Sequence, residues 1–213
     1  MTAEQFIERV LTVLNDVNSE IFDAELIGSD EVQMNNHIRL LYPSAWRKAV
    51  NLLPKHHFRQ KDGSSLYIVP NLSDGTGYII LPNDFYRLAN LRMKGWKISC
   101  FEALPENEQI NRRQQNEYTR GSFLRPVCVL RREPVNNNIM VNVIWYYSLK
   151  RGLEQHEIEK FAYIPIETEL PNPVSTTDTA AEIIAWITAE MMLTGQEKTK
   201  QADIVQQKYL QML

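Results

Sequence analysis

The sequence has only two cysteines, no long apolar run and no strong excess of charge of either sign. Cys100 and Cys128 are too few for a disulfide framework and form no CxxC pair, which indicates a reducing compartment. No stretch reaches the roughly 20 apolar residues that span a bilayer, and the opening MTAEQFIERVL lacks the basic flank of a signal peptide. The net charge of −3 provides no overall basic field, although a local basic patch remains open. We therefore expect a chain that folds in a cytoplasm.

The composition that is present favours a globular fold. With 213 residues, of which 44% are hydrophobic, the chain is long enough for one sizeable core and is not disordered as a whole. No internal repeat or linker is visible, which predicts a single domain over residues 1–213. The pattern predicts an α+β fold, with N-terminal helices and a C-terminal helix pair packed with a mostly antiparallel β region in the middle.

Residues 1–54 have the spacing of helices. Thr2 and Gln5 predict a capping box at the first helix. Its apolar positions recur on one face and are Phe6, Ile7, Val10, Leu11, Leu14 and Val17. A second helix is predicted from Ser29 to Leu41, ended by Pro43, and a short third helix from Ser44 to Leu53.

Residues 65–166 change to the period of strands. LYIVP and GYIILP predict two strands around the turn-rich NLSDGTG, and the aromatic stretch YIILPNDFYRLANLRMKGWKIS continues to a turn at Gly95. RPVCVLRRE and NIMVNVIWYYS predict a hairpin across three asparagines. Its expected apolar face consists of Val127, Val129, Ile139, Val141, Val143 and Trp145. Between these strands, the polar segment 105–124 is predicted to project from the sheet as a long loop or a partly exposed helix.

Residues 176–213 predict two further helices. Thr179 and Glu182 are expected to form a capping box at the start of the first helix, and Gly195 is expected to end that helix. The first helix is apolar nearly all round, which is typical of a central packing helix. The last, from Gln196 to Leu213, is amphipathic and can meet a partner.

No catalytic, cofactor or metal site is predicted. His56 and His57 are adjacent, so in an extended segment they would point in opposite directions and could not share a metal ion. Gly75 and Gly77 lead into a strand rather than a helix, which favours a hairpin over a phosphate loop. No GxSxG motif is present. Cys100 and Cys128 are expected to be buried apolar groups. We expect no enzyme, while a hydrolase with an unrecognised site stays open.

An arginine cluster lies in and after the polar segment. Its members are Arg112, Arg113, Arg120, Arg125, Arg131 and Arg132. The simplest explanation of this cluster is a set of solvated surface side chains. The alternative is that the chain is a nucleic-acid-binding or regulatory protein that uses the 112–132 cluster. Tyr118 and Phe123 flank the cluster, and such a mixture of arginine and aromatic residues is typical of protein interfaces. The interface candidates here are Arg112, Arg113, Tyr118, Arg120 and Phe123.

The order of LPNDFYRLANLRMKGW at 81–96, NEYTRGSFLRPVCV, AAEIIAWITAEMML and the terminal DIVQQKYLQML resembles the head-to-tail adaptor proteins of short-tailed bacteriophages. Within that group it is most similar to the ring proteins of crAss-like phages, from about Val32 onward.

This resemblance implies a structural virion protein in the neck or tail, made in the host bacterial cytoplasm. Such proteins form a homo-oligomeric ring, usually of twelve copies, below the portal protein. The ring extends the DNA channel, touches packaged DNA transiently during ejection, and docks other ring or tail proteins. A C-terminal segment commonly engages the portal, which makes Lys208, Tyr209, Leu210 and Leu213 candidate contacts.

Overall fold

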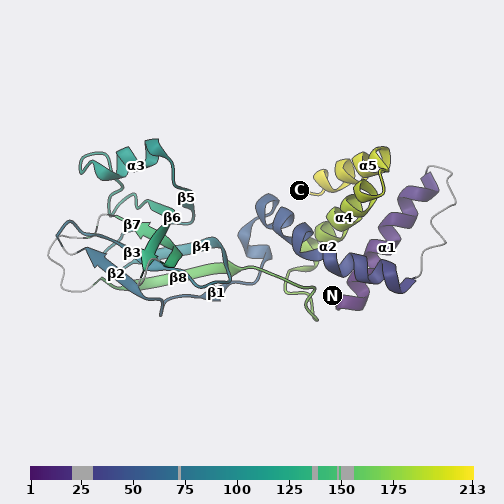
Figure 1. Cartoon of the computed structure of the whole chain (residues 1–213), viewed down its shortest axis with the longest axis horizontal. Coiled ribbons are helices and arrows are strands. Elements are labelled where there is room, and N and C mark those ends of the chain that lie inside the picture. The colour runs from purple at the N-terminus through teal and green to yellow at the C-terminus, as the bar shows by residue number, and fades with distance from the viewer. Residues whose placement is uncertain (21–30, 72, 136–138, 148, 150–155) are drawn as a thin grey trace. The chain divides into compact units, whose positions relative to one another are not determined.

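The computed structural model describes residues 1–20, 31–71, 73–135, 139–147, 149 and 156–213 (Figure 1). The chain forms two compact units, one from residues 1–59 and 166–213 and the other from residues 60–165. We call the first the helical unit and the second the β unit. Helices at both ends and mostly antiparallel strands in the middle confirm the predicted α+β class. That the whole chain behaves as one domain stays a prediction.

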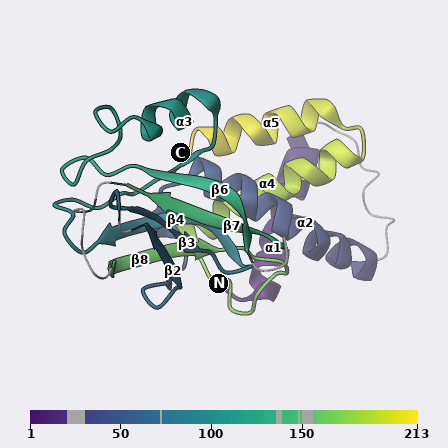
Figure 2. The same cartoon turned by 60° about the vertical axis from the view of Figure 1, so that its left-hand side comes forward.

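The helical unit joins the two ends of the chain. Its elements are α1 (Ala3–Glu20), α2 (Glu31–Leu52), the 3-10 turn η1 (Lys55–His57), α4 (Asp178–Gly195) and α5 (Thr199–Leu210). Helix α4 contacts α1, α2 and α5, and eleven of its residues are buried. This confirms α4 as the central packing helix, and Figure 2 shows α5 running beside it.

The capping box at α1 is confirmed. The Thr2 backbone N–H donates to Gln5 Oε1 at 2.8 Å, and the Gln5 N–H donates to Thr2 Oγ1 at 3.2 Å. The predicted stripe is buried except for Leu11, which is half-buried. The cap predicted at Thr179 is wrong, because Thr177 is the N-cap of α4 and accepts from the Ala180 N–H. Glu182 instead binds Arg9 and Trp186.

The predicted break at Pro43 is also wrong, because α2 continues through it to Leu52. Proline cannot donate to the carbonyl four residues earlier and costs about 3 kcal/mol inside a helix. The loss is offset because Ile38 and Tyr42 before Pro43 and Trp46 after it are all buried, so one continuous helix keeps them in the core. The predicted start at Ser29 lies outside the described residues.

The described residues of the β unit form two sheets. The first has the order β1 (Lys61–Asp62), β8 (Ile158–Pro165), β4 (Phe85–Met93), and the second has the order β2 (Ile68–Asn71), β3 (Thr76–Ile80), β7 (Ile139–Tyr146), β6 (Cys128–Val135), β5 (Ala103–Pro105). Among the strand pairs of the described residues, only β5–β6 is parallel. One core cluster draws on both sheets, with Leu88, Leu91 and Phe161 from the first and Ile79 and Ile144 from the second.

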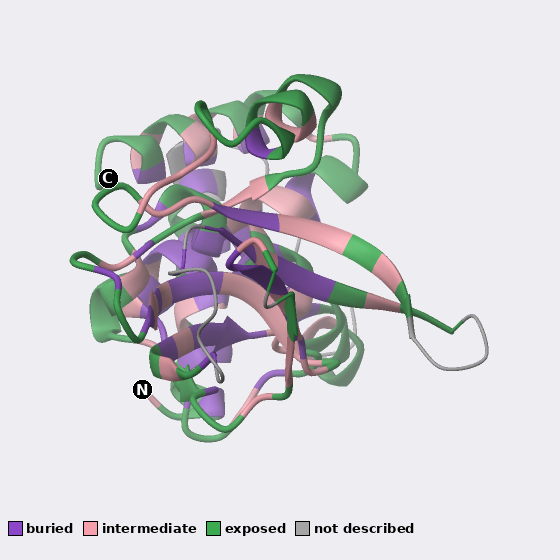
Figure 3. Cartoon of the chain, turned by 90° about the vertical axis from the view of Figure 1, so that its left-hand side faces the viewer, coloured by how far each residue is buried: buried purple, intermediate pink, exposed green. Residues whose placement is uncertain are grey.

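The β6–β7 hairpin is confirmed, with Val129 opposite Trp145 and Leu130 opposite Ile144. On the predicted apolar face, Val129 and Val143 are buried, Trp145 is half-buried and Ile139 is exposed. Cys128, Ile144 and Tyr146 lie on the other face and join the core cluster. Figure 3 shows the two strands buried at their base and increasingly exposed away from it. The β2–β3 hairpin expected around Gly75 and Gly77 is likewise present.

No helix in the described ranges is both long enough and apolar enough to cross a membrane.

Candidate interaction surfaces and a polar hollow

The C-terminal candidates separate into buried and exposed side chains. Tyr209 is only 1% exposed, and its hydroxyl donates to Glu190 at 3.1 Å, so it holds α5 against α4 and cannot be a surface contact. The Lys208 ammonium lies 5.9 Å from the Trp186 ring centre. Leu210 and Leu213 are exposed, together with Met212, which sequence analysis missed. We call Leu210, Met212 and Leu213 the C-terminal apolar patch.

The segment predicted to project from the sheet is tied to it. It contains α3 (Glu108–Gln115), which is capped by Asn107 through a 2.8 Å bond from the Ile110 N–H. Arg131 of β6 donates to Asn111 of this helix. Gln114, a buried residue of α3, accepts from the Gly121 N–H at 2.9 Å. The Arg131–Asn111 bond therefore ties the segment to the second sheet, and the Gln114–Gly121 bond gives a buried amide the partner that it needs.

The outer side of this segment is exposed. Arg112 and Arg113 face solvent, and Arg112 forms an ion pair with Glu108 one turn away. Tyr118 is 96% exposed, and Phe123 is about half-exposed. The Lys97 N–H donates to the Phe123 carbonyl at 2.9 Å, so two loops meet there. The same loops carry three further exposed apolar residues, Ile98, Phe101 and Leu124, which the sequence analysis did not single out.

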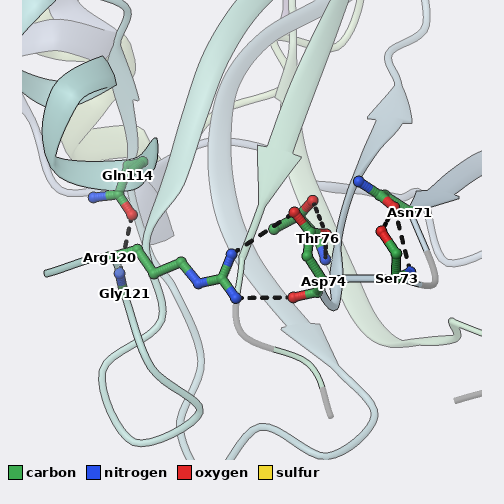
Figure 4. Close-up of polar contacts among 7 residues, drawn as sticks. All are labelled: Asn71, Ser73, Asp74, Thr76, Gln114, Arg120 and Gly121. Atoms are coloured by element: carbon green, nitrogen blue, oxygen red, sulfur yellow. Dashed lines mark hydrogen bonds and ion pairs between the residues drawn. The ribbon is translucent and has the colours of Figure 1, made fainter. Parts of the chain in front are cut away.

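Arg120 differs from the other interface candidates because it is bound within the β unit (Figure 4). One guanidinium nitrogen donates to the Asp74 carbonyl oxygen at 2.9 Å, and another lies 3.8 Å from the Asp74 carboxylate. The Asp74 carboxylate in turn accepts from the Thr76 N–H at 3.0 Å and from the Thr76 hydroxyl at 2.7 Å. Gly75 takes a φ of +71° inside this turn, a conformation that glycine adopts without strain. Arg120 therefore joins the α3 segment to the β2–β3 turn.

A hollow of about 320 Å³ lies beside this contact. Its walls come from the β2–β3 turn, the end of α3, Arg120, and the strands β6 and β7 with Tyr147 just beyond. The Arg131 guanidinium stands 5.4 Å from the Trp145 ring centre, and Trp145 stacks on Tyr147 at 6.4 Å. Burial raises the pKa of Tyr147, so its hydroxyl stays neutral near pH 7.

The arginine cluster is therefore divided in two. Arg120 and Arg131 are mostly buried and make contacts inside the β unit, whereas Arg112, Arg113, Arg125 and Arg132 are exposed. Glu106 contacts Arg131 at 3.4 Å. Sequence spacing could not separate these groups, because the division depends on which residues face the hollow.

The expected orientation of His56 and His57 is wrong. They lie in η1 rather than in an extended segment, so their ring centres are 4.2 Å apart. His57 Nδ1 is 2.8 Å from the Thr177 hydroxyl. Across the described ranges, no group of three or more histidine, cysteine, aspartate or glutamate residues could hold a metal ion.

Both cysteines are buried free thiols, as expected. Burial raises the pKa of Cys128, and a hydrogen bond with Cys100 raises it further. The Cys100 thiol donates to the Glu102 carbonyl at 3.1 Å. The Cys128 thiol is therefore protonated, and both buried cysteines are packing groups.

Comparison with known protein families finds no match. A search of curated proteins finds none either. The likeness to phage adaptor proteins therefore stays a prediction.

Proposed function

We propose that this chain is a structural virion protein that forms a head-to-tail connector ring below the portal, extends the DNA channel and docks tail components. The observation that carries the proposal is that each unit holds its own exposed apolar surface on an ordered support. The helical unit presents the C-terminal apolar patch, and the β unit presents Tyr118, Phe123 and Leu124. Exposed aromatic and apolar groups of this kind mark interaction sites.

Two different surfaces suit a ring. Each copy in a ring contacts its two neighbours through different faces, and the ring closes when the rotations between copies complete a circle. In the proposed assembly, one surface serves the neighbouring copy or the portal, and the other serves the next ring or tail protein. The chain's net charge of −3 also suits a channel wall, since a strongly basic wall would retain DNA.

Immunogold electron microscopy of particles from the source phage tests the proposed location. An antibody against this chain should label a single vertex, at the neck. Particles without label would overturn the connector proposal, and label over the whole capsid would replace it with a shell protein.

Point substitutions test the proposed contacts better than deletion of α5. Removing residues 196–213 would uncover α4, since Ala202, Val205 and Tyr209 are buried on it. The variants Leu210→Asp and Leu213→Asp place a charge in the C-terminal apolar patch and should abolish incorporation into particles. Gln207→Asp, at an exposed position of α5, is the matched control and should incorporate normally. Normal incorporation of both leucine variants would contradict a role for this patch.

A nucleic-acid-binding protein is the second candidate, favoured by the exposure of Arg112, Arg113 and Arg125 on one segment. Such a protein would bind duplex DNA with an affinity that falls steeply with salt and is lost when the three arginines become alanine. Binding that is absent, or that ignores salt, would eliminate this candidate.

A further inference from the structure

The polar hollow of the β unit is a built pocket whose chemistry the connector proposal does not use. Its volume of about 320 Å³ falls at the lower end of the range for small-ligand sites. The elements around it are fixed by the Arg120–Asp74 contact and by the Gln114–Gly121 hydrogen bond (Figure 4). The site is therefore held open by hydrogen bonds rather than by loop conformation alone.

Two buried donors at this hollow lack an acceptor among the described residues. They are the Tyr147 hydroxyl and the Arg131 Nε–H. Glu106 is the nearest carboxylate to Arg131 Nε, at 3.4 Å, and makes an ion pair but no hydrogen bond to it. A buried donor without a partner has lost its hydrogen bonds to water without replacing them. A ligand that brings acceptor oxygens to the hollow would replace them.

The buried charge around the hollow is positive. The side chains of Arg120 and Arg131 are 12% and 14% exposed. Their counterions, Asp74 and Glu106, are 39% and 45% exposed and are therefore screened by solvent. A guanidinium group binds a carboxylate through two parallel hydrogen bonds, and the strength of such a pair rises as water is excluded.

Two aromatic side chains form part of the wall of the hollow. They are Trp145 and Tyr147, and the Trp145 ring contacts the Arg131 guanidinium and the Tyr147 ring. We propose that this hollow binds a carboxylate-bearing group whose oxygens accept hydrogen bonds from Arg120, Arg131 and Tyr147 and which lies beside Trp145. The group is either a free small acid or the acidic side chain of another protein. This inference does not depend on ring assembly.

Nuclear magnetic resonance of the Trp145 indole N–H, identified with the Trp145→Phe variant, tests the proposal on the full chain. N-acetylglutamate is the probe, and N-acetylglutamine is its neutral match. The acid should shift the resonance saturably, and the amide should not. Arg120→Gln should weaken binding about tenfold or more, since it removes a charged donor, and Tyr147→Phe should weaken it about threefold to tenfold. Arg125→Gln, outside the hollow, should bind like the parent chain.

Equal shifts from the acid and the amide would overturn the proposal, as would absence of any shift with either a free acid or an acidic peptide. Arg120→Gln also removes the contact to Asp74, so if that variant fails to fold, Tyr147→Phe decides, and unchanged binding by it would overturn the proposal. A capped peptide with a central glutamate identifies the source. Binding at least about tenfold tighter than N-acetylglutamate assigns the hollow to a partner's side chain, and equal binding assigns it to a small acid.

Discussion

The helical unit and the β unit use polar side chains in different ways. In the helical unit, ion pairs join helices across an apolar core, as with Arg9 to Glu182 and Lys48 to Glu190. In the β unit, Asp74, Arg120 and Gln114 hold an exposed segment over a sheet and leave a polar hollow beneath it. The β unit also has ion pairs between its segments, such as Lys61 with Asp84, so the two units differ in the additional contacts that position the α3 segment.

Both units contain carboxylates whose pKa is lowered by a cation. The Arg9 guanidinium lowers the pKa of Glu182 in the helical unit, and Lys61 lowers the pKa of Asp84 in the β unit, because the charged carboxylate is the form that an ion pair stabilises. The β unit adds a shift of another kind, since burial lowers the pKa of His156 against an opposing effect of Asp74. Burial therefore favours a neutral imidazole at this position of the β unit.

The largest expected effect comes from removing a core side chain of the helical unit. Trp46 is buried and meets Phe58 edge-on at 6.0 Å. Trp46→Ala should lower the free energy of unfolding of this unit by about 3–5 kcal/mol, as measured by urea titration. Ser44→Ala, at an exposed position of α2, should change it by less than about 0.5 kcal/mol.

Hydrogen exchange shows whether this loss stays within one unit. The amide of Ile144, in the core of the β unit, should keep its protection in Trp46→Ala. If Trp46→Ala instead lowers the free energy of exchange at Ile144 by as much as it lowers the free energy of unfolding of the helical unit, the two units unfold together, as a single domain does.

A clash in the β unit should produce the next largest effect. A Cβ atom at Gly77 would lie 2.3 Å from the Tyr146 hydroxyl oxygen and 2.7 Å from the Val69 carbonyl oxygen. Because the carbonyl belongs to the paired strand β2, it cannot move without breaking the hairpin. Gly77→Ala should destabilise the β unit by about 1–3 kcal/mol. An unchanged urea midpoint would mean that the β2–β3 pairing is looser than described.

Acid should affect the β unit before the helical unit. His156 Nδ1 is 2.6 Å from the Tyr146 hydroxyl, and its other ring nitrogen is buried without a partner among the described residues. Since the folded pKa is lowered, its stabilising contribution is complete above the unfolded pKa of about 6.5 and is lost as the pH falls through the folded pKa. Glu182 loses its contribution only below its usual pKa of 4.5.

Unfolding measured between pH 8 and pH 4 tests this order. The β unit should weaken below about pH 6.5, and His156→Gln should flatten that dependence. His37→Gln, at an exposed position of α2, should leave it intact. A helical unit that weakens first would reverse the comparison.

Local patterns predicted elements well where local contacts decide. The Thr2–Gln5 box, the apolar character of α4 and the asparagine-rich hairpin connection all act within a few residues. Local patterns failed where the burial of side chains against residues distant in the sequence decides the structure. Pro43 signals a break, but the stripe from Ile38 to Trp46 keeps α2 continuous.

The polar hollow lay beyond sequence reasoning for the same reason. Arg120 and Asp74 are 46 residues apart and meet only because α3 folds over the second sheet. The one available signal was Asp74 beside Gly75, which indicates a turn but not its partner. Tyr209 shows the converse, since its position in a terminal helix suggested a surface contact although its side chain is buried.

The smallest expected effect comes from replacing a glycine that faces open space, and two such glycines can be compared. A Cβ atom at Gly195 or at Gly95 would meet nothing within 4 Å, so packing cannot distinguish the two positions. Gly195 ends α4 without a positive φ, and Gly195→Ala should raise the free energy of unfolding by about 0.4–1 kcal/mol, since alanine restricts the unfolded chain. Gly95 turns with a φ of +99°, so Gly95→Ala should lower that free energy by about 1–2 kcal/mol. Urea titration of both variants checks the opposite signs. Equal signs would show that backbone conformation does not decide the outcome at these positions.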